Sequence, residues 1–103
     1  MRAADVFTDM KQRFDADAAA GLDAVFQYEF SDDENHHIVV EGGSCTIAQG
    51  DHASPTVTLS CDLATFIGIA DGSINGMQAF ITGKLKATGN VILAQKMQTL
   101  FPK

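Results

Sequence analysis

The sequence predicts an α+β domain, with a five-stranded, mostly antiparallel sheet covered on one face by about five helices. Two patterns support this prediction. Near both ends of the chain apolar residues recur every three or four positions, as in amphipathic helices, whereas between residues 22 and 61 apolar and polar residues alternate, as in half-buried strands. With 103 residues, 46% hydrophobic and 19% charged, the chain has the size and composition of one globular domain, residues 1–103.

The first part of the chain predicts two helices followed by a meander of strands. An amphipathic helix near the N-terminus carries four apolar residues on one face: Val6, Phe7, Met10 and Phe14. The stretch DADAAAG, residues 15–21, predicts a short second helix that ends at Gly21. Alternation then predicts strands at residues 22–30, 36–41, 44–49 and 56–61. The turns between the first three strands are short, so these strands must pair antiparallel.

The last third of the chain returns to the helical period. Asp62 and Ser73 are each suited to cap a helix, because a short polar side chain accepts a hydrogen bond from the N–H groups of the first turn. Residues 84–88 alternate again and predict the fifth strand, with its two lysines pointing outward. Gly89-Asn90 then opens a last helix over residues 91–101.

Charge is distributed unevenly along the chain. All thirteen acidic residues precede Ile74, whereas four lysines and no acid follow it, and the net charge is −6. A net acidic chain is a poor nucleic-acid binder, because that binding depends on many lysine and arginine contacts with phosphates. The N-terminus lacks the apolar run of a signal peptide, and no stretch approaches the roughly 20 apolar residues of a membrane span. We therefore expect a cytoplasmic protein.

The sequence contains no recognisable motif for catalysis, a cofactor or a metal ion. Neither a phosphate loop nor a Gly-x-Gly-x-x-Gly dinucleotide motif is present. Cys45 and Cys61 lack zinc-ligand spacing and are expected to be small buried residues. His36 and His37 are neighbours on a strand, so they point to opposite faces and cannot hold one ion. The acids of the turn at 31–35 are expected to be solvated. We expect neither an enzyme nor a cofactor or metal site.

The three late helices have more large apolar residues than solvated helices need: Phe66, Ile67, Ile74, Met77, Phe80, Ile81, Leu93, Met97, Leu100 and Phe101. Apolar stripes at helical spacing usually form an ordinary core. Methionine, however, is flexible and suits a surface that repacks around varied ligands. The residues alone leave two interpretations open, a filled core or the wall of an apolar pocket.

The C-terminal third also contains a specific signature. It reads Asp71-Gly72, Ala79-Phe80, Gly83-Lys84-Leu85-Lys86, Gly89-Asn90, Leu93-Ala94, Lys96 and Leu100. Together with the upstream segments TVTLS (56–60) and DLATF (62–66), this pattern resembles the sterol carrier protein 2 family over essentially the whole chain. The resemblance implies helices and a sheet that enclose an apolar tunnel for fatty acids, fatty acyl-CoA, sterols or phospholipids, without catalytic residues.

The resemblance also implies which residues contact the lipid. Carried over by position, the tunnel wall consists of Val57, Leu59, Phe66, Ile67, Ala70, Ile74, Met77, Phe80, Ile81, Leu93, Met97 and Leu100. Lys84, Lys86 and Lys96 would then meet an anionic headgroup or CoA phosphates at the tunnel mouth, or else simply solvate outward faces. Such a module binds or transfers lipids with low specificity and allows brief contact with a membrane. The alternative is an accessory domain without a ligand, which supports a partner enzyme of lipid or quinone metabolism.

Overall fold

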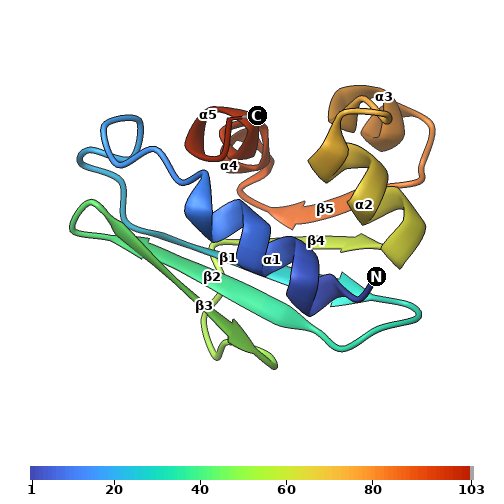
Figure 1. Cartoon of the computed structure of the whole chain (residues 1–103), viewed down its shortest axis with the longest axis horizontal. Coiled ribbons are helices and arrows are strands. Elements are labelled where there is room, and N and C mark those ends of the chain that lie inside the picture. The colour runs from blue at the N-terminus through green and yellow to red at the C-terminus, as the bar shows by residue number, and fades with distance from the viewer. Residues whose placement is uncertain (103) are drawn as a thin grey trace.

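The structure, a computed structural model, describes residues 1–102 and has the predicted α+β fold class. Figure 1 shows a single sheet with the helices gathered on one of its faces. In chain order the elements are α1 (Ala3–Gln12), β1 (Ala24–Phe30), β2 (His36–Glu41), β3 (Ser44–Gln49), β4 (Val57–Cys61), α2 (Leu63–Asp71), α3 (Gly76–Ile81), β5 (Lys86–Gly89), α4 (Val91–Gln95) and α5 (Met97–Leu100).

The strands lie in the order β3-β2-β1-β4-β5. All neighbours pair antiparallel except β1 and β4, which run in parallel with Phe26 opposite Val57. Parallel neighbours cannot be joined by a tight turn, and the chain forms the β2–β3 hairpin before it returns to place β4 beside β1. β1 is therefore the central strand. The hairpin lies on one side of it, and β4 and β5 lie on the other.

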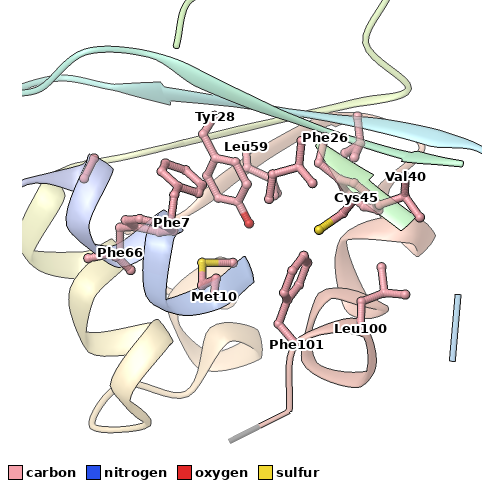
Figure 2. Packing of buried hydrophobic residues seen from close by; sticks show 14 of the residues in the cluster. Phe7, Met10, Phe26, Tyr28, Val40, Cys45, Leu59, Phe66, Leu100 and Phe101 are labelled. Atoms are coloured by element: carbon pink, nitrogen blue, oxygen red, sulfur yellow. The ribbon is translucent and has the colours of Figure 1, made fainter. Parts of the chain in front are cut away.

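An aromatic cluster fixes α1 and α2 on the sheet. Alternate residues of β1 face the helices, and Phe26 and Tyr28 are 0% and 5% exposed, as the alternation predicts. Phe7 of α1 lies 4.8 Å from Phe66 of α2 and 5.3 Å from Tyr28, measured between ring centroids (Figure 2). Aromatic pairs at these distances add about 0.5–1.5 kcal/mol each beyond the area they bury. The two helices are thus held by the same group of rings.

The opposite face of the sheet is partly covered by the loop that leads into β4. Gln27 points to this face, yet it is only 2% exposed. Its Nε2 donates to the carbonyl oxygen of His36 at 3.2 Å and to Asp51 Oδ1 at 3.1 Å, and its Oε1 accepts from the His52 N–H at 2.7 Å. A buried amide must find such partners. Gln27 therefore ties the crossing loop to the central strand.

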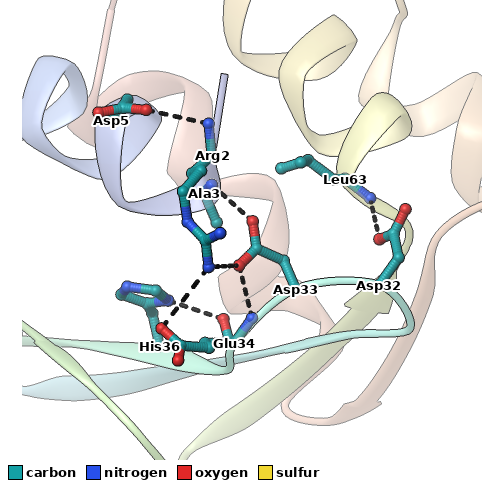
Figure 3. A network of polar contacts seen from close by, with 8 residues as sticks. All are labelled: Arg2, Ala3, Asp5, Asp32, Asp33, Glu34, His36 and Leu63. Atoms are coloured by element: carbon teal, nitrogen blue, oxygen red, sulfur yellow. Dashed lines mark hydrogen bonds and ion pairs between the residues drawn. The ribbon is translucent and has the colours of Figure 1, made fainter.

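The acidic turn between β1 and β2 supports the first turns of two helices (Figure 3). Asp33 Oδ2 accepts from the Ala3 N–H at 2.9 Å, and Asp33 Oδ1 accepts from the Arg2 guanidinium at 3.2 Å. Asp32 Oδ1 accepts from the Leu63 N–H at 2.8 Å, where α2 begins. Carboxylates are favourable here because a helix N-terminus has a positive partial charge. The expectation of a solvated turn is wrong for Asp33, whose side chain is 5% exposed.

Residues 15–21 form a series of turns and not the predicted helix. Asp15 begins these turns in the manner of a helix cap, because its Oδ1 accepts from the N–H groups of Asp17 at 3.0 Å and Ala18 at 3.2 Å. The backbone bonds from Ala19 to Ala16 and from Ala20 to Asp17, both 3.2 Å, span three residues and do not continue as an α-helix. The Asp15 N–H donates to the Leu100 carbonyl oxygen at 2.8 Å. Through this last bond, the segment that follows α1 is attached to the end of α5.

Of the three C-terminal helices predicted, the first forms as expected and the other two are shorter. Asp62 caps α2 as expected, because its Oδ1 accepts from the Thr65 N–H at 2.8 Å. Ser73 does not cap α3; Asn75 does, by accepting from the Gln78 N–H at 3.0 Å. The last helix is divided at Lys96 into α4 and α5. These short elements surround the cavity described next.

Candidate binding cavity

A partly open cavity of about 840 Å³ lies between the sheet and the C-terminal helices. Tyr28 of β1, Leu59 and Cys61 of β4 and Ala87 of β5 form the sheet side of its wall, and most of the other lining residues belong to α2, α3, α4 and α5. Met10 of α1 and Phe101 border the cavity where it meets the core, and Figure 2 shows both near Tyr28. The volume falls in the range of about 300–1,000 Å³ that is typical of small-molecule sites. Most of the lining side chains are apolar.

Seven of the twelve residues implied by the resemblance lie on the cavity wall: Leu59, Phe66, Ala70, Ile74, Met77, Phe80 and Met97. The other five lie elsewhere. Val57 and Leu100 are each 1% exposed in the core, Ile67 and Leu93 are half-buried against that core, and Ile81 is 71% exposed. Neighbouring positions on a helix point about 100° apart. For this reason α3 presents Phe80 to the cavity and Ile81 to the surface.

The three lysines implied as headgroup ligands do not line the cavity within residues 1–102. Lys84, Lys86 and Lys96 are all exposed on the surface. In β5 the alternation of side chains directs Ala87 to the cavity and Lys86 away from it. The interpretation in which these lysines solvate outward faces fits this placement.

Five polar side chains on the wall were not identified from the sequence: Arg13, Tyr28, Asn75, Gln95 and Gln98. Arg13 follows the last residue of α1, three positions after Met10, so the two share a helical face. Its Nη2 pairs with Asp9 Oδ2 at 3.1 Å, while its Nε is buried without a hydrogen-bond partner among the described residues. Burial raises the pKa of Tyr28 far above its usual value. The Tyr28 hydroxyl is therefore neutral at physiological pH.

Cys61 also lies on the wall, but it is a poor nucleophile. Burial raises the pKa of its thiol to about 12, and the nearby carboxylates of Asp62 and Asp32 act in the same direction. Burial likewise raises the pKa of Cys45. Only the thiolate attacks or binds metal readily. Within residues 1–102 no three His, Cys, Asp or Glu side chains lie together in a way that could hold a metal ion.

Exposed apolar side chains gather on α3 and α4. Met77, Phe80, Ile81, Val91 and Ile92 are between 42% and 71% exposed. Met77, Phe80 and Val91 are at the same time part of the cavity wall. The cavity wall and the exposed apolar surface of α3 and α4 therefore share these three residues. Across residues 1–102 no helix has both the length and the apolar character needed to cross a bilayer.

The chain is similar to parts of several curated proteins. Hydroxysteroid dehydrogenase-like protein 2 of Bos taurus is 28% identical over 102 residues, which is 94% of this chain and 24% of the relative. The chain spans 9% to 54% of the length of four further curated relatives. It therefore corresponds to only a part of most of the proteins it resembles.

Solved structures share the fold. The sec-alkylsulfatase Pisa1 from Pseudomonas sp. aligns with a TM-score of 0.83 and 22% identity over 91% of this chain and 15% of the sulfatase. Palmitated SCP2L2 from Aedes aegypti aligns with a TM-score of 0.74 and 22% identity over 100% of this chain and 96% of the other. A family model described as the SCP-2 sterol transfer family matches residues 7–102. Because this match covers nearly the whole sequence, the chain belongs to the SCP-2 sterol transfer family.

Proposed function

We propose that this chain binds single lipid molecules in the cavity and transfers them, without catalysing a reaction. One observation carries the proposal: a cavity of about 840 Å³ whose wall is built mainly from apolar side chains. Family membership is consistent with a lipid as the occupant. The protonated state of Cys61 agrees with a binding role.

The size of the cavity excludes a closed and empty state on energetic grounds. In engineered proteins, empty apolar space costs about 24 cal/mol per Å³. At that rate a closed and dry cavity of 840 Å³ would cost about 20 kcal/mol, more than the roughly 5–15 kcal/mol total stability of a domain. The space must therefore be open to water, filled by a ligand, or reduced by movement of α3 and α4.

The proposed binding is broad in specificity. Apolar burial contributes about 25 cal/mol per Å² and has no preferred direction, so it discriminates weakly between lipid chains. Met77 and Met97 on the wall add flexible side chains that can repack around ligands of different shape. The chain length or branching of the lipid would thus change affinity only gradually.

Mass spectrometry of the protein purified without detergent tests the proposal. We expect one lipid per chain under native conditions, identified after organic extraction. Phe80→Ser should lose it because Phe80 lies on the cavity wall, whereas Ile81→Ser is the matched control on the exposed side of the same helix. Circular dichroism should show that both variants keep the fold.

The proposal fails if the wild-type protein carries no lipid and shows no thermal stabilisation with added palmitate, palmitoyl-CoA or cholesterol. The second candidate function, an accessory domain that supports an enzyme, would then be favoured. Ile81 and Ile92 support that candidate, because they are 71% and 69% exposed and do not line the cavity within the described chain. Exposed apolar residues of this kind mark protein or membrane contacts. Ile81→Ser would then weaken partner binding.

A further inference from the structure

We propose that two copies of this chain form a dimer through β3, the free edge of the sheet, with their β3 strands antiparallel about a two-fold axis at Ile47. The two sheets then continue into one another. Among residues 1–102, the wall of the lipid cavity contains no residue of β3. The inference therefore goes beyond the proposed function and does not depend on it.

β3 presents unpaired backbone groups along its outer side. Within residues 1–102, the strand order places β2 on one side of β3 and no strand on the other (Figure 1). The Gly50 N–H donates to the Asn35 carbonyl oxygen at 2.7 Å, and these two residues continue the register of β2 and β3. Because successive residues of an antiparallel strand bond to alternate sides, the backbone groups of Cys45, Ile47 and Gln49 point away from β2. They are available to a further strand.

The sequence of β3 does not protect this edge. Natural sheets protect their edges with charged side chains, prolines or very short strands. At the other edge of the sheet, β5 has only four residues, carries Lys86 and ends at Gly89, whose φ is +95°. β3 has six residues, SCTIAQ, with neither a charge nor a proline. Its centre, Thr46-Ile47, is β-branched and favours an extended, paired backbone.

A two-fold axis at Ile47 uses every outward backbone group of β3. Ile47 pairs with Ile47 of the second copy, and Cys45 pairs with Gln49 of the second copy, so that each residue both donates and accepts. Any other two-fold register moves one of these three residues beyond the end of the facing strand. The strand has no charge, so no like charges meet in the pairing. β3 is thus complementary to itself, as a two-fold interface requires.

An open groove of about 540 Å³ beside β3 gives the central side chain of the second copy a place to pack. Ala4 and Thr8 of α1 line the groove on the helix side, and Ile47 lines it on the sheet side. Ile47 is only partly buried, and alternation places it on the helix face together with the buried Cys45. Ile47 of the second copy would cover the exposed part of this residue, which adds apolar burial to the backbone hydrogen bonds.

Charges beside the groove favour a second copy over an unrelated strand. Burial raises the pKa of the Cys45 thiol and the Lys11 ammonium acts in the opposite direction, so Lys11 lies near the Cys45 end of β3. Glu34 lies near the Gln49 end, and its Oε2 is 3.9 Å from Arg2 Nη2. The two-fold axis brings the Cys45 end of one copy beside the Gln49 end of the other. Lys11 of each copy therefore approaches the acidic end of its neighbour, and such complementarity favours this pairing.

Disulfide cross-linking tests the register. Two α-carbons in a hydrogen-bonded antiparallel pair lie about 5.5 Å apart, within the range of about 4.4–6.8 Å that a disulfide spans. Ile47→Cys should therefore give a covalent dimer on mild oxidation, seen on a non-reducing gel. Thr46→Cys is the matched control, because Thr46 points to the other face of the sheet and pairs with Ala48 of the second copy. Both variants keep Cys45 and Cys61, so the control accounts for the native thiols.

Sedimentation velocity tests the dimer itself. A short edge makes a small interface, so the wild-type protein should change from monomer to dimer between about 10 µM and 1 mM. Ile47→Lys places two like charges at the axis and should raise the dissociation constant by about tenfold or more. Thr46→Lys adds the same charge on the other face and should change it by less than about threefold. Palmitate binding should be the same in both variants, because neither residue lines the cavity.

The possible results either support the inference or overturn it. A chain that remains monomeric up to about 1 mM overturns it and leaves β3 available to a strand of another protein. A dimer that Ile47→Lys does not weaken uses another surface, which also overturns it. Equal cross-linking of Ile47→Cys and Thr46→Cys rules out the axis at Ile47. Should Ile47→Lys fail to fold, the two cysteine variants decide, and none of these results bears on whether the cavity binds lipid.

Discussion

Two regions of the molecule place their apolar side chains differently. The first region is the sheet with α1 and α2, and the second region is formed by α3, α4 and α5. In the first region Phe26 and Ile38 are completely buried. In the second, Phe80 is 44% and Ile81 71% exposed, and α4 has no buried residue. Full burial of a large apolar side chain contributes about 1.5–3 kcal/mol. The first region therefore holds most of the stability, and the second retains apolar surface that a ligand can cover.

Polar groups differ between the regions in the same way. In the first region Asp32 and Asp33 support the starts of α1 and α2, and Gln27 ties a loop to the sheet. The segment from Ile74 onward has no acid, and Lys84, Lys86 and Lys96 are exposed. Stability and binding thus depend largely on different residues. Substitutions in the part of the cavity wall formed by α3 and α4 can be tested without unfolding the protein, and the following predictions examine that separation.

The largest expected effect is the difference in stability loss between truncating a phenylalanine of the first region and truncating one of the second. Phe26→Ala should lower the free energy of unfolding by about 3–5 kcal/mol, because it leaves a cavity in a completely buried site. Phe80→Ala should lower it by less than about 1 kcal/mol, since the side chain is already 44% exposed. Urea unfolding followed by circular dichroism measures both. Equal losses for the two variants would show that the regions are not separate in stability.

A smaller effect is expected at the junction of the two regions. A Cβ atom at Gly68 of α2 would overlap the Ile74 side chain, which lies on the cavity wall. Gly68→Ala should therefore destabilise the protein by about 1–3 kcal/mol, the usual range for overpacking, and should also weaken lipid binding by displacing Ile74. The double variant Gly68→Ala with Ile74→Ala removes the overlap and should recover part of the stability. No recovery would mean that the overlap is not the cause.

The smallest expected effect is a loss of folding stability at low pH. Hydrogen bonds from the N–H groups of Ala3 and Glu34 hold the pKa of Asp33 below its usual value, and hydrogen bonds from Thr65 do the same for Asp62. Because the folded pKa values lie below the unfolded value of about 3.9, both carboxylates stabilise the fold above that pH. Their contribution is lost as the pH falls through the folded values.

The urea midpoint should accordingly be level between about pH 7 and 5 and should fall below about pH 4. Asp62→Ala should cost about 1 kcal/mol at neutral pH and should flatten this acid dependence. The effect belongs to the first region alone, so ligand affinity at pH 7 should stay unchanged in this variant. A midpoint that rises on acidification would contradict the assignment.

The sequence predicted the first region better than the second. Alternation of apolar and polar residues located the strands, because each strand has one face in the core. Near the C-terminus, apolar residues serve three purposes: Leu100 fills the core, Met97 lines the cavity, and Ile92 lies on the surface. All three side chains are apolar, although their surroundings differ. The pattern therefore could not say which of these residues face the cavity.

The missed features depend on contacts between distant segments. The sequence gives no sign that the Asp15 N–H donates to the Leu100 carbonyl oxygen, a contact that accompanies turns where a helix was predicted. Arg13 reads as the polar end of an amphipathic helix, although its position three residues after Met10 places it on the buried side. That helical spacing was the one available signal for Arg13. The alternation along residues 22–30 is consistent with an inward-facing Tyr28, while the orientation of its hydroxyl required the structure.

The parallel pairing of β1 with β4 has a consequence for the order in which the protein folds. Val25 and Thr56, which are hydrogen-bonded at this junction, are 31 residues apart in the chain. The β1–β2 and β2–β3 pairs are joined by short turns and close quickly, whereas a contact across a long chain segment costs more loop-closure entropy. We expect the three-stranded meander to form first and β4 to dock late. Leu59 then reaches Tyr28 only in this last stage, so the binding cavity would be among the final parts of the molecule to assemble.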